Sequence, residues 1–375
     1  MNELSVLTEH IQKNASHYFA DLDTDKTTIH FINKQVRKTS VLYRFSIESE
    51  GEFRAILVKI ALPQRERQTQ VKGALHLSDR PRLAAITEPQ TKVQFEFLAL
   101  SKIYQRFGTV QNTCFGAIQP LDYLPSFPAI IMIEEQAPNL RQLLIQTHRL
   151  QWKRGMRNLE PVFHHAGAWL QIYHRLPKAE HTRLRHGTRN DFITSIHDFC
   201  DFLAGQLGSQ TFFQTMNTTI AQLANQYLPA ELPIGLGHGD YTMRNILVDA
   251  ADRVTVLDTL CKWQTPIYED IGYFLARLKA AGPQALAQGF LFNNKQLATY
   301  EDAFLCGYWG AEPVPYAQIR LYEVQALLDY WTSQASVLKR IQPQTSIKMT
   351  KQQVKLSLMN RFLFTYSNRL LDTIN

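Results

Sequence analysis

A short segment in the second half of the chain carries the residues best suited to chemistry. It begins with His238-Gly239-Asp240, and Asn245 and Asp258 follow five and eighteen residues after Asp240. Carboxylate and amide oxygens are ligands that Mg²⁺ accepts, and a further carboxylate can take a proton from a hydroxyl group. The residue types and spacing therefore predict a metal pair, Asn245 and Asp258, together with a general base, Asp240.

Short apolar runs on either side predict how this segment is held. Residues 233–236, 246–248 and 254–257 have the composition of strands, which places Asp240 and Asn245 on the loop between the first two. A hairpin joining the last two runs would bring Asn245 close to Asp258. Taken singly, His-Gly-Asp is an ordinary turn and Asp258 an ordinary strand end. The combination favours phosphoryl transfer, which needs a metal held near phosphates and a carboxylate that orients the acceptor hydroxyl.

The rest of the chain predicts a strand-rich first part and a helical second part. The elements expected first are a helix, a strand, a two-stranded hairpin, a second helix and another strand, at residues 3–19, 28–32, 40–48 with 52–61, 91–107 and 128–133. Residues 62–90 are polar, show no clear period and indicate an irregular connection. Helical periods then dominate, at 162–176, 191–207, 271–278, 319–331 and 354–371.

This order is typical of an α+β fold with two lobes. We expect a small antiparallel-sheet lobe that binds nucleotide over residues 1–134. We expect a larger, mainly helical lobe over 135–375, carrying the catalytic loop, the metal site and the acceptor site. Pro138-Asn139 breaks the chain after the strand at 128–133 and marks the boundary. A cleft between lobes is the natural place for a small molecule.

Composition narrows the class of protein. The chain has 375 residues, 45% hydrophobic and 19% charged, which is typical of a globular protein of two or three packed units. A net charge of +7 favours anionic ligands, from nucleotides to nucleic acid or a membrane surface, but no basic-aromatic module indicates specific nucleic-acid binding.

Localisation is predicted from what the sequence lacks. The four cysteines show no CxxC pair, which favours buried thiols in a reducing compartment. The N-terminus lacks the layout of a signal peptide, and no apolar run is long enough to span a bilayer. We therefore expect a cytoplasmic protein without a membrane span, and the sequence does not predict its oligomeric state.

The pattern of motifs resembles one known family. Residues 238–247 and 256–258, with a helix end at 170–174 and a Pro-x-x-x-Asp segment at 266–272, resemble the aminoglycoside phosphotransferase/choline kinase family, which has a protein-kinase-like fold. By this resemblance, Asp240 is the base, and Asn245 and Asp258 hold Mg²⁺. Asp270 braces the catalytic loop through hydrogen bonds, with a helix N-cap as its alternative role.

The resemblance also implies nucleotide-binding residues in the first lobe. Lys59 interrupts the apolar run of the strand at 52–61 and matches the family's phosphate-binding Lys, which a Glu on the next helix holds. Glu96 is the expected partner and Glu88 the alternative. A strand Lys in isolation is as often a solvated edge residue.

Two further parts of the nucleotide site are implied. The turn expected at 33–40 has no glycine-rich phosphate loop, and Ser40 and Thr39 would donate to phosphate there. The strand at 128–133 matches the family's hinge, so main-chain groups of Ile133 and Glu135 would hydrogen-bond adenine while Met132 lines the pocket.

The resemblance thus implies an ATP- and Mg²⁺-dependent phosphotransferase acting on a hydroxyl of a small molecule, with GTP also open as donor. Candidate acceptors are a sugar, aminosugar, aminoglycoside or amino alcohol. The net charge favours a sugar or glycan over a cation, since Glu269, Glu301 and Asp302 are the only close acidic group after the metal site. The alternatives are a protein kinase, for which the connection from Asp258 to Pro266 is short, a pseudokinase, and a metal hydrolase, for which the histidines lack supporting spacing.

Overall fold

The structure is a computed structural model that describes residues 3–23, 26–37, 40–62, 88–109, 114–125, 127–149, 157–286, 294–338 and 351–374. The chain forms two compact units. The first contains the described residues up to 137 together with 255–260, and the second contains those of 138–254 and 261–374. Most of the connection expected at 62–90 lies outside the described residues, as does Thr39.

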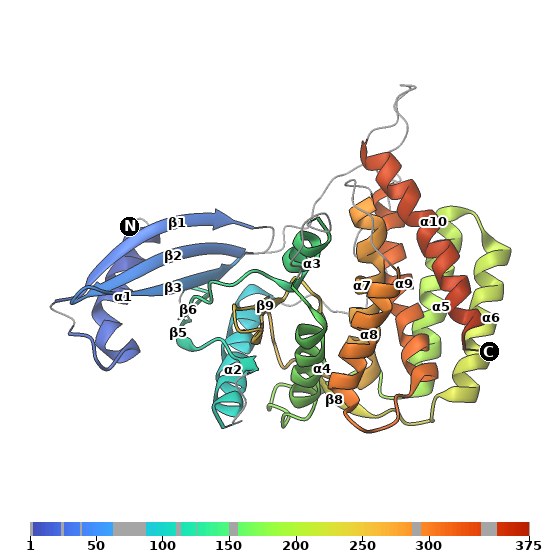
Figure 1. The fold of residues 1–375 in the computed structure, drawn as a ribbon, viewed down its shortest axis with the longest axis horizontal. Helices are drawn as coiled ribbons and strands as arrows, with labels where there is room; N and C mark the ends of the chain where they lie inside the picture. The colour runs from blue at the N-terminus through green and yellow to red at the C-terminus, as the bar shows by residue number, and fades with distance from the viewer. Residues whose placement is uncertain are drawn as a thin grey trace. The chain divides into compact units, whose positions relative to one another are not determined.

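An antiparallel sheet of five strands forms the centre of the first unit (Figure 1). Its order is β1-β2-β3-β6-β5, and the strands span, in that order, Thr28–Val36, Ser40–Ser49, Glu52–Ala61, Ala129–Ile133 and Pro120–Leu124. β2 and β3 form the predicted hairpin, with Ser49 opposite Glu52. β1 runs past its expected end, because residues 33–36 also pair with β2, which shortens the turn expected at 33–40.

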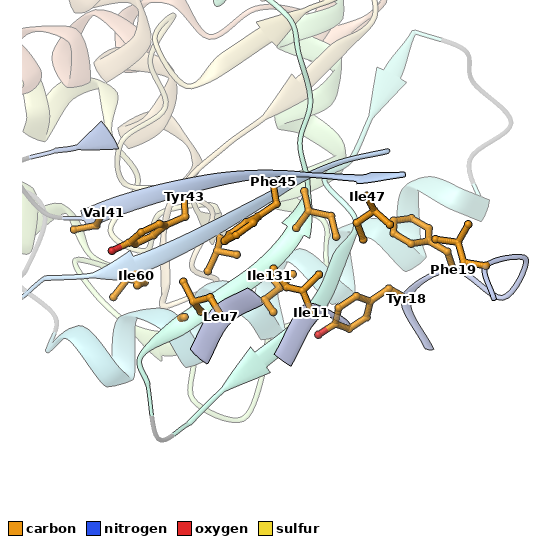
Figure 2. Close-up of a cluster of buried hydrophobic side chains, with 14 residues drawn as sticks. Leu7, Ile11, Tyr18, Phe19, Val41, Tyr43, Phe45, Ile47, Ile60 and Ile131 are labelled. Carbon is orange, nitrogen blue, oxygen red and sulfur yellow. The ribbon is translucent and has the colours of Figure 1, made fainter. Parts of the chain in front are cut away.

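One face of the sheet packs on α1 (Glu3–Tyr18), as Figure 2 shows. Side chains alternate between the two faces of a strand, so Tyr43, Phe45 and Ile47 of β2 all point to the same side. There they form an apolar cluster with Leu7 and Ile11, both at most 1% exposed. The helical spacing of apolar residues in α1 and the strand alternation in β2 thus build one core.

The other face packs on α2 (Pro89–Thr109), which is preceded by Glu88. Ile130 and Met132 of β6 form a second cluster there with Val93 and Leu100 of α2. Pro89 begins the helix, where a missing N–H is tolerated. A two-residue strand, β4 (Phe115–Gly116), follows α2.

The second unit is mainly helical. Its helices are α3 (Leu140–Arg149), α4 (Glu160–His174), α5 (Arg189–Leu207), α6 (Gln210–Tyr227), α7 (Ile267–Leu286), α8 (Asn294–Trp309), α9 (Tyr316–Leu338) and α10 (Lys351–Asp372). α4 packs on α8, α7 on α9, and α5 on both α6 and α9 (Figure 1). Asn139 caps α3 by accepting from the Gln142 N–H at 2.9 Å, so the predicted break at Pro138-Asn139 is also a helix start.

Short strands carry the predicted chemical segment. β8 (Ile234–Gly237) pairs antiparallel with β11 (Trp263–Pro266), which pairs parallel with β7 (Arg183–Leu184). β9 (Ile246–Val248) and β10 (Val254–Val256) are joined by the predicted turn, in which the Asp249 N–H donates to the Arg253 carbonyl at 3.2 Å. The loop between β8 and β9 contains Asp240 and Asn245.

The contact between α4 and α8 depends on two glycines. A Cβ added at Gly167 of α4 would lie 2.0 Å from the Phe304 carbonyl oxygen, and one added at Gly307 of α8 would lie 1.9 Å from the His164 carbonyl oxygen. Two helix backbones therefore approach each other where only hydrogen atoms fit. This approach fixes α4, which ends at His174 beside the candidate site described below.

We predict that Gly167→Ala lowers the free energy of unfolding by about 2–3 kcal/mol, because the added methyl group forces α4 and α8 apart. Gly205→Ala in α5 is the matched control, since a Cβ there meets nothing within 4 Å. The control is expected to be neutral or to stabilise by up to about 1 kcal/mol, as alanine favours helix. Urea unfolding of both variants measures the difference, and equal stabilities would contradict the close approach.

Candidate active site

The loop after β8 is held by one buried carboxylate. Asp270 lies in the first turn of α7 and is 2% exposed. Its two oxygens accept from consecutive main-chain N–H groups, Oδ2 from His238 at 2.6 Å and Oδ1 from Gly239 at 2.8 Å. Asp270 thus has the bracing role implied by the resemblance, and the loop's conformation depends on its charge.

A second shell of hydrogen bonds holds Asp270 itself. His174, the last residue of α4, lies with Nε2 3.2 Å from Asp270 Oδ2, while its Nδ1 lies 2.7 Å from the Tyr308 hydroxyl. Burial alone would raise the pKa of Asp270, but hydrogen bonding and charge from His174, together with His238, outweigh it and lower that pKa. Asp270 is therefore ionised when it binds the loop.

Small residues in β8 make room for this arrangement. A Cβ at Gly235 would lie 2.8 Å from His174 Cβ, and one at Gly237 would lie 2.4 Å from Thr265 Oγ1. Beyond the loop, Tyr241 is fully buried and its hydroxyl donates to the Ala166 carbonyl at 2.7 Å. The loop is thus anchored before Asp240 by Asp270 and after it by Tyr241, while Asp240 itself is exposed.

Asp240 and Asn245 lie on the same loop, as predicted, and they contact each other. Asn245 Nδ2 donates to the Asp240 carbonyl at 2.9 Å and lies 3.2 Å from Asp240 Oδ2. The amide oxygen of Asn245 therefore points away from these two contacts, and an amide oxygen is a group that Mg²⁺ accepts. The exposed carboxylate of Asp240 is oriented by Asn245 and can accept a proton.

The predicted Lys59–Glu96 pair forms in the first unit. Lys59 Nζ lies 2.6 Å from Glu96 Oε1, and it also forms an ion pair with Asp258. Val58 and Ile60 point to the α1 face, so alternation turns Lys59 to the α2 face. Glu96 lies three residues after Val93 and four before Leu100, on the buried stripe of α2, and is 3% exposed.

This cluster holds two carboxylates against one ammonium group. Burial disfavours the charged form of Lys59, but Asp258 and Glu96 outweigh it and raise its pKa. Burial raises the pKa of Glu96, an effect that the Lys59 charge opposes. Of the two carboxylates, that of Asp258 is the more accessible, with its side chain 44% exposed.

The backbone at Asp258 is unusual. Its φ is +59°, in the left-handed region that few residues other than glycine adopt. Such conformations cost roughly 1–3 kcal/mol and cluster at functional sites. Aspartate tolerates this region better than most residues. The conformation turns the chain sharply after Leu257, which packs against the α2-side core of the first unit.

Ser40 and Ile133, predicted to bind nucleotide, both lie in the sheet of the first unit. Ser40 is 4% exposed and begins β2, where its carbonyl accepts from the Arg37 N–H at 2.8 Å. The Ile133 N–H donates to the Gln119 carbonyl and the Glu134 N–H to the Ala55 carbonyl, both at 3.0 Å. At Ile133, the carbonyl is therefore the main-chain group to consider for a ligand.

Sequence reasoning missed several residues beside the loop. Tyr308 supports His174 from α8, a helix that was not among the predicted elements. Arg141, Arg244 and Arg277 line a pocket with Thr242 and Met243. No sequence signal marks these arginines, because an arginine on a helix or loop is usually solvated and they lie far apart along the chain.

Comparison with known proteins supports the predicted class. Residues 146–312, which include Asp240, Asn245, Asp258 and Asp270, match the family model APH, the phosphotransferase enzyme family. No curated protein matches the chain. The predicted resemblance to the aminoglycoside phosphotransferase family is thereby confirmed over this part of the chain.

Solved structures extend the likeness to the fold of the whole chain. An ethanolamine kinase from Plasmodium vivax has a TM-score of 0.50 at 11% identity, covering 98% of this chain and 91% of its own. A glucosamine kinase in complex with glucosamine, ADP and inorganic phosphate has a TM-score of 0.55 at 12% identity, covering 98% and 87%. The predicted α+β, protein-kinase-like fold is confirmed.

The described part of the chain lacks two features. No group of three or more His, Cys, Asp or Glu side chains there is arranged to hold a metal. No helix within those residues is long and apolar enough to cross a membrane.

We predict that Asp270→Asn destabilises the protein by about 2–3 kcal/mol. An amide has one acceptor oxygen, so one of the two N–H groups, of His238 or Gly239, loses its partner in a buried place. Hydrogen exchange should show faster exchange of these two amides, and urea unfolding gives the stability. Asp302→Asn, at an exposed position of α8, is the control and should leave both unchanged. Retained protection of both amides in Asp270→Asn would contradict the bracing role.

The pH dependence of this effect has a definite sign. The pKa of Asp270 is lowered from 3.8 on folding, so its stabilising contribution is complete above pH 3.8 and is lost as the pH falls through the folded-state pKa. The stability difference between the wild type and Asp270→Asn should therefore be constant from pH 8 to about 5 and shrink in stronger acid. A difference that grows on acidification would mean that Asp270 is protonated in the folded protein.

Proposed function

We propose that the chain is an ATP- and Mg²⁺-dependent phosphotransferase that transfers the γ-phosphate to a hydroxyl group of a small molecule. The observation that carries this proposal is the hydrogen-bonded pair of Asp240 and Asn245 on a loop held by ionised Asp270. The family-model match over the same segment and the Lys59–Glu96–Asp258 cluster support it.

Each residue has a definite role in the proposed reaction. Asp240 orients the acceptor hydroxyl and takes its proton, and Asn245 fixes the Asp240 carboxylate. Asp258 and the amide oxygen of Asn245 would hold Mg²⁺, which supplies charge neutralisation at the phosphates. Lys59, positioned by Glu96, pairs with phosphate oxygens, and the Ile133 carbonyl and Glu135 N–H are proposed for adenine. Ser40 is proposed for phosphate contact.

The transfer itself balances without a further reactant. The acceptor oxygen bonds to the γ-phosphorus as the bond from that phosphorus to the bridging oxygen breaks, and ADP leaves with the electron pair. The hydroxyl proton passes to Asp240 and then to solvent. ATP is the proposed donor, with GTP tested beside it. A cytoplasmic location agrees with ATP as the donor and is part of the proposal.

We predict that Asp240→Asn lowers kcat for phosphotransfer by about 10²–10⁴-fold, because the amide cannot accept the hydroxyl proton. The KM for Mg·ATP and the stability should change little, since Asp240 is exposed. Coupled detection of ADP over a panel of hydroxylated metabolites measures turnover, with Asp302→Asn as the charge-matched control. Full turnover by Asp240→Asn would overturn the assignment of the base.

Metal dependence is tested without knowing the acceptor. Because a ligand that binds only the folded state stabilises it, Mg·ATP should raise the Tm of the wild type, and excess EDTA should remove most of that rise. Asp258→Asn should show the smaller, EDTA-insensitive rise, whereas Asp302→Asn should behave as the wild type. Absence of any Mg²⁺-dependent stabilisation by ATP or GTP in the wild type would count against the proposed function as a whole.

A further inference from the structure

A basic pocket adjoins the loop that carries Asp240. It lies wholly within the second unit and is lined by Arg141, Thr242, Met243, Arg244, Arg277 and Ala281. Thr242 and Arg244 are only two and four residues from Asp240, so two residues of chain, at most about 7 Å, separate Thr242 from the proposed base. A small molecule that places a hydroxyl at Asp240 can reach this pocket.

Three elements contribute one arginine each. Arg141 lies in the first turn of α3, whose position is tied to the loop because its N–H donates to the Met243 carbonyl at 3.1 Å. Arg244 is exposed on the loop itself. The pKa of Arg141 is lowered, first by burial and then by repulsion from Arg244. Both arginines line the same pocket, and an anion bound there would offset their mutual repulsion.

Arg277 of α7 is the most rigidly held of the three. Its guanidinium lies over the rings of Tyr273 and Tyr330, 4.9 and 4.3 Å from their centroids, and donates to the Tyr273 hydroxyl at 2.7 Å. Its Nε is buried and has no hydrogen-bond partner among the described residues. The two ring contacts and the hydrogen bond to Tyr273 restrict the guanidinium, a group that can recognise a carboxylate or phosphate.

The acidic groups around the pocket do not cancel its charge. The negative charge of Asp329 on α9 attracts the Arg277 guanidinium. Burial raises the pKa of the Tyr273 hydroxyl, and the negative charge of Asp240 raises it further. Asp240 is the proposed base and faces the acceptor. Among the residues that line the pocket, three are arginines and none is acidic.

Two of the three acidic residues considered for a cationic acceptor, Glu269 and Glu301, are already paired, and the third, Asp302, is exposed on α8. Glu269 forms an ion pair with Arg185, and Glu301 forms ion pairs with both Lys279 and Arg320. Both glutamates are buried, at 5% and 3% exposed. They are therefore occupied within the helical core.

We propose that the acceptor is an anionic hydroxyl compound, such as a phosphorylated or carboxylate-bearing sugar, whose anionic group binds Arg141, Arg244 and Arg277 while its hydroxyl lies at Asp240. This inference rests on the proposed phosphotransferase function and specifies its substrate class. The shared chemistry is a phosphate or carboxylate on a small polyol.

Four matched probes test the charge preference: glucose 6-phosphate, gluconate, glucose and glucosamine. Isothermal titration of the full-length protein in the presence of Mg·ADP should show binding of the two anions, and coupled ADP detection with Mg·ATP should favour them by at least tenfold in kcat/KM. Comparing glucose 6-phosphate with gluconate separates phosphate from carboxylate recognition. Equal or better binding of glucose or glucosamine overturns the proposal, as does failure of both anions to bind.

The arginine variants assign the effect to the pocket. Arg244→Gln should weaken anion binding and raise the acceptor KM by about 10- to 100-fold, the usual effect of losing a charged hydrogen bond, with the KM for ATP unchanged. Arg361→Gln removes the same charge from an exposed position on α10 and should change neither. Unchanged anion binding in Arg244→Gln, or an effect confined to the KM for ATP, overturns the assignment.

Failure of the proposed function would have a different signature. Anion binding to the pocket is measured by titration and needs no turnover, and it can be repeated without nucleotide. A protein that binds glucose 6-phosphate through Arg244 but neither binds Mg·ADP nor consumes ATP would retain the pocket and lose the phosphotransferase proposal. A protein that consumes ATP with neutral acceptors but not with anionic ones would keep the phosphotransferase proposal and overturn the proposal of an anionic acceptor.

Discussion

The loop that carries Asp240 depends on the charge of one buried carboxylate. Asp270 receives two consecutive main-chain N–H groups and the His174 imidazole, so it joins the end of β8, the end of α4 and the start of α7 in a single group. A buried charge is costly unless it is hydrogen-bonded, and here three donors satisfy it. Because both oxygens must accept, neither an amide nor a protonated acid replaces it.

The helical core positions the residues that hold Asp270. His174 can reach Asp270 only because α4 is set close to α8 through Gly167 and Gly307, and α8 also supplies Tyr308 to the other imidazole nitrogen. The aromatic packing of Tyr241 against Trp169 and Phe274 holds the far side of the loop. Asp240 itself needs no burial, since its backbone is fixed at both ends and Asn245 orients its carboxylate.

Local periodicity explains which parts of the site could be predicted. Lys59 and Glu96 were expected from the family resemblance, and periodicity explains why they meet. Lys59 faces α2 because its strand neighbours face α1, and Glu96 faces the sheet because it shares a helical stripe with Val93 and Leu100. The loop bearing Asp240 was predicted because its spacing is local. The extent of β1 was not, since pairing with β2, a tertiary contact, extends it.

The arginine pocket could not be predicted for a related reason. Its three arginines come from α3, the loop and α7, and no local pattern distinguishes them from solvated surface residues. The tertiary packing of α3, α7 and the loop brings them together. The net charge of +7 indicated a preference for anions but not where the charge would gather.

Charge imbalance is the property that the two parts of the proposed site share, with opposite signs. In the first unit, Glu96 and Asp258 exceed Lys59 by one negative charge, which a divalent cation would offset. In the second unit, Arg141, Arg244 and Arg277 leave a positive excess beside the loop, which an anion would offset. Each charge would be offset by one component of the proposed reaction. Charge complementarity of this kind would let binding energy order both components before transfer.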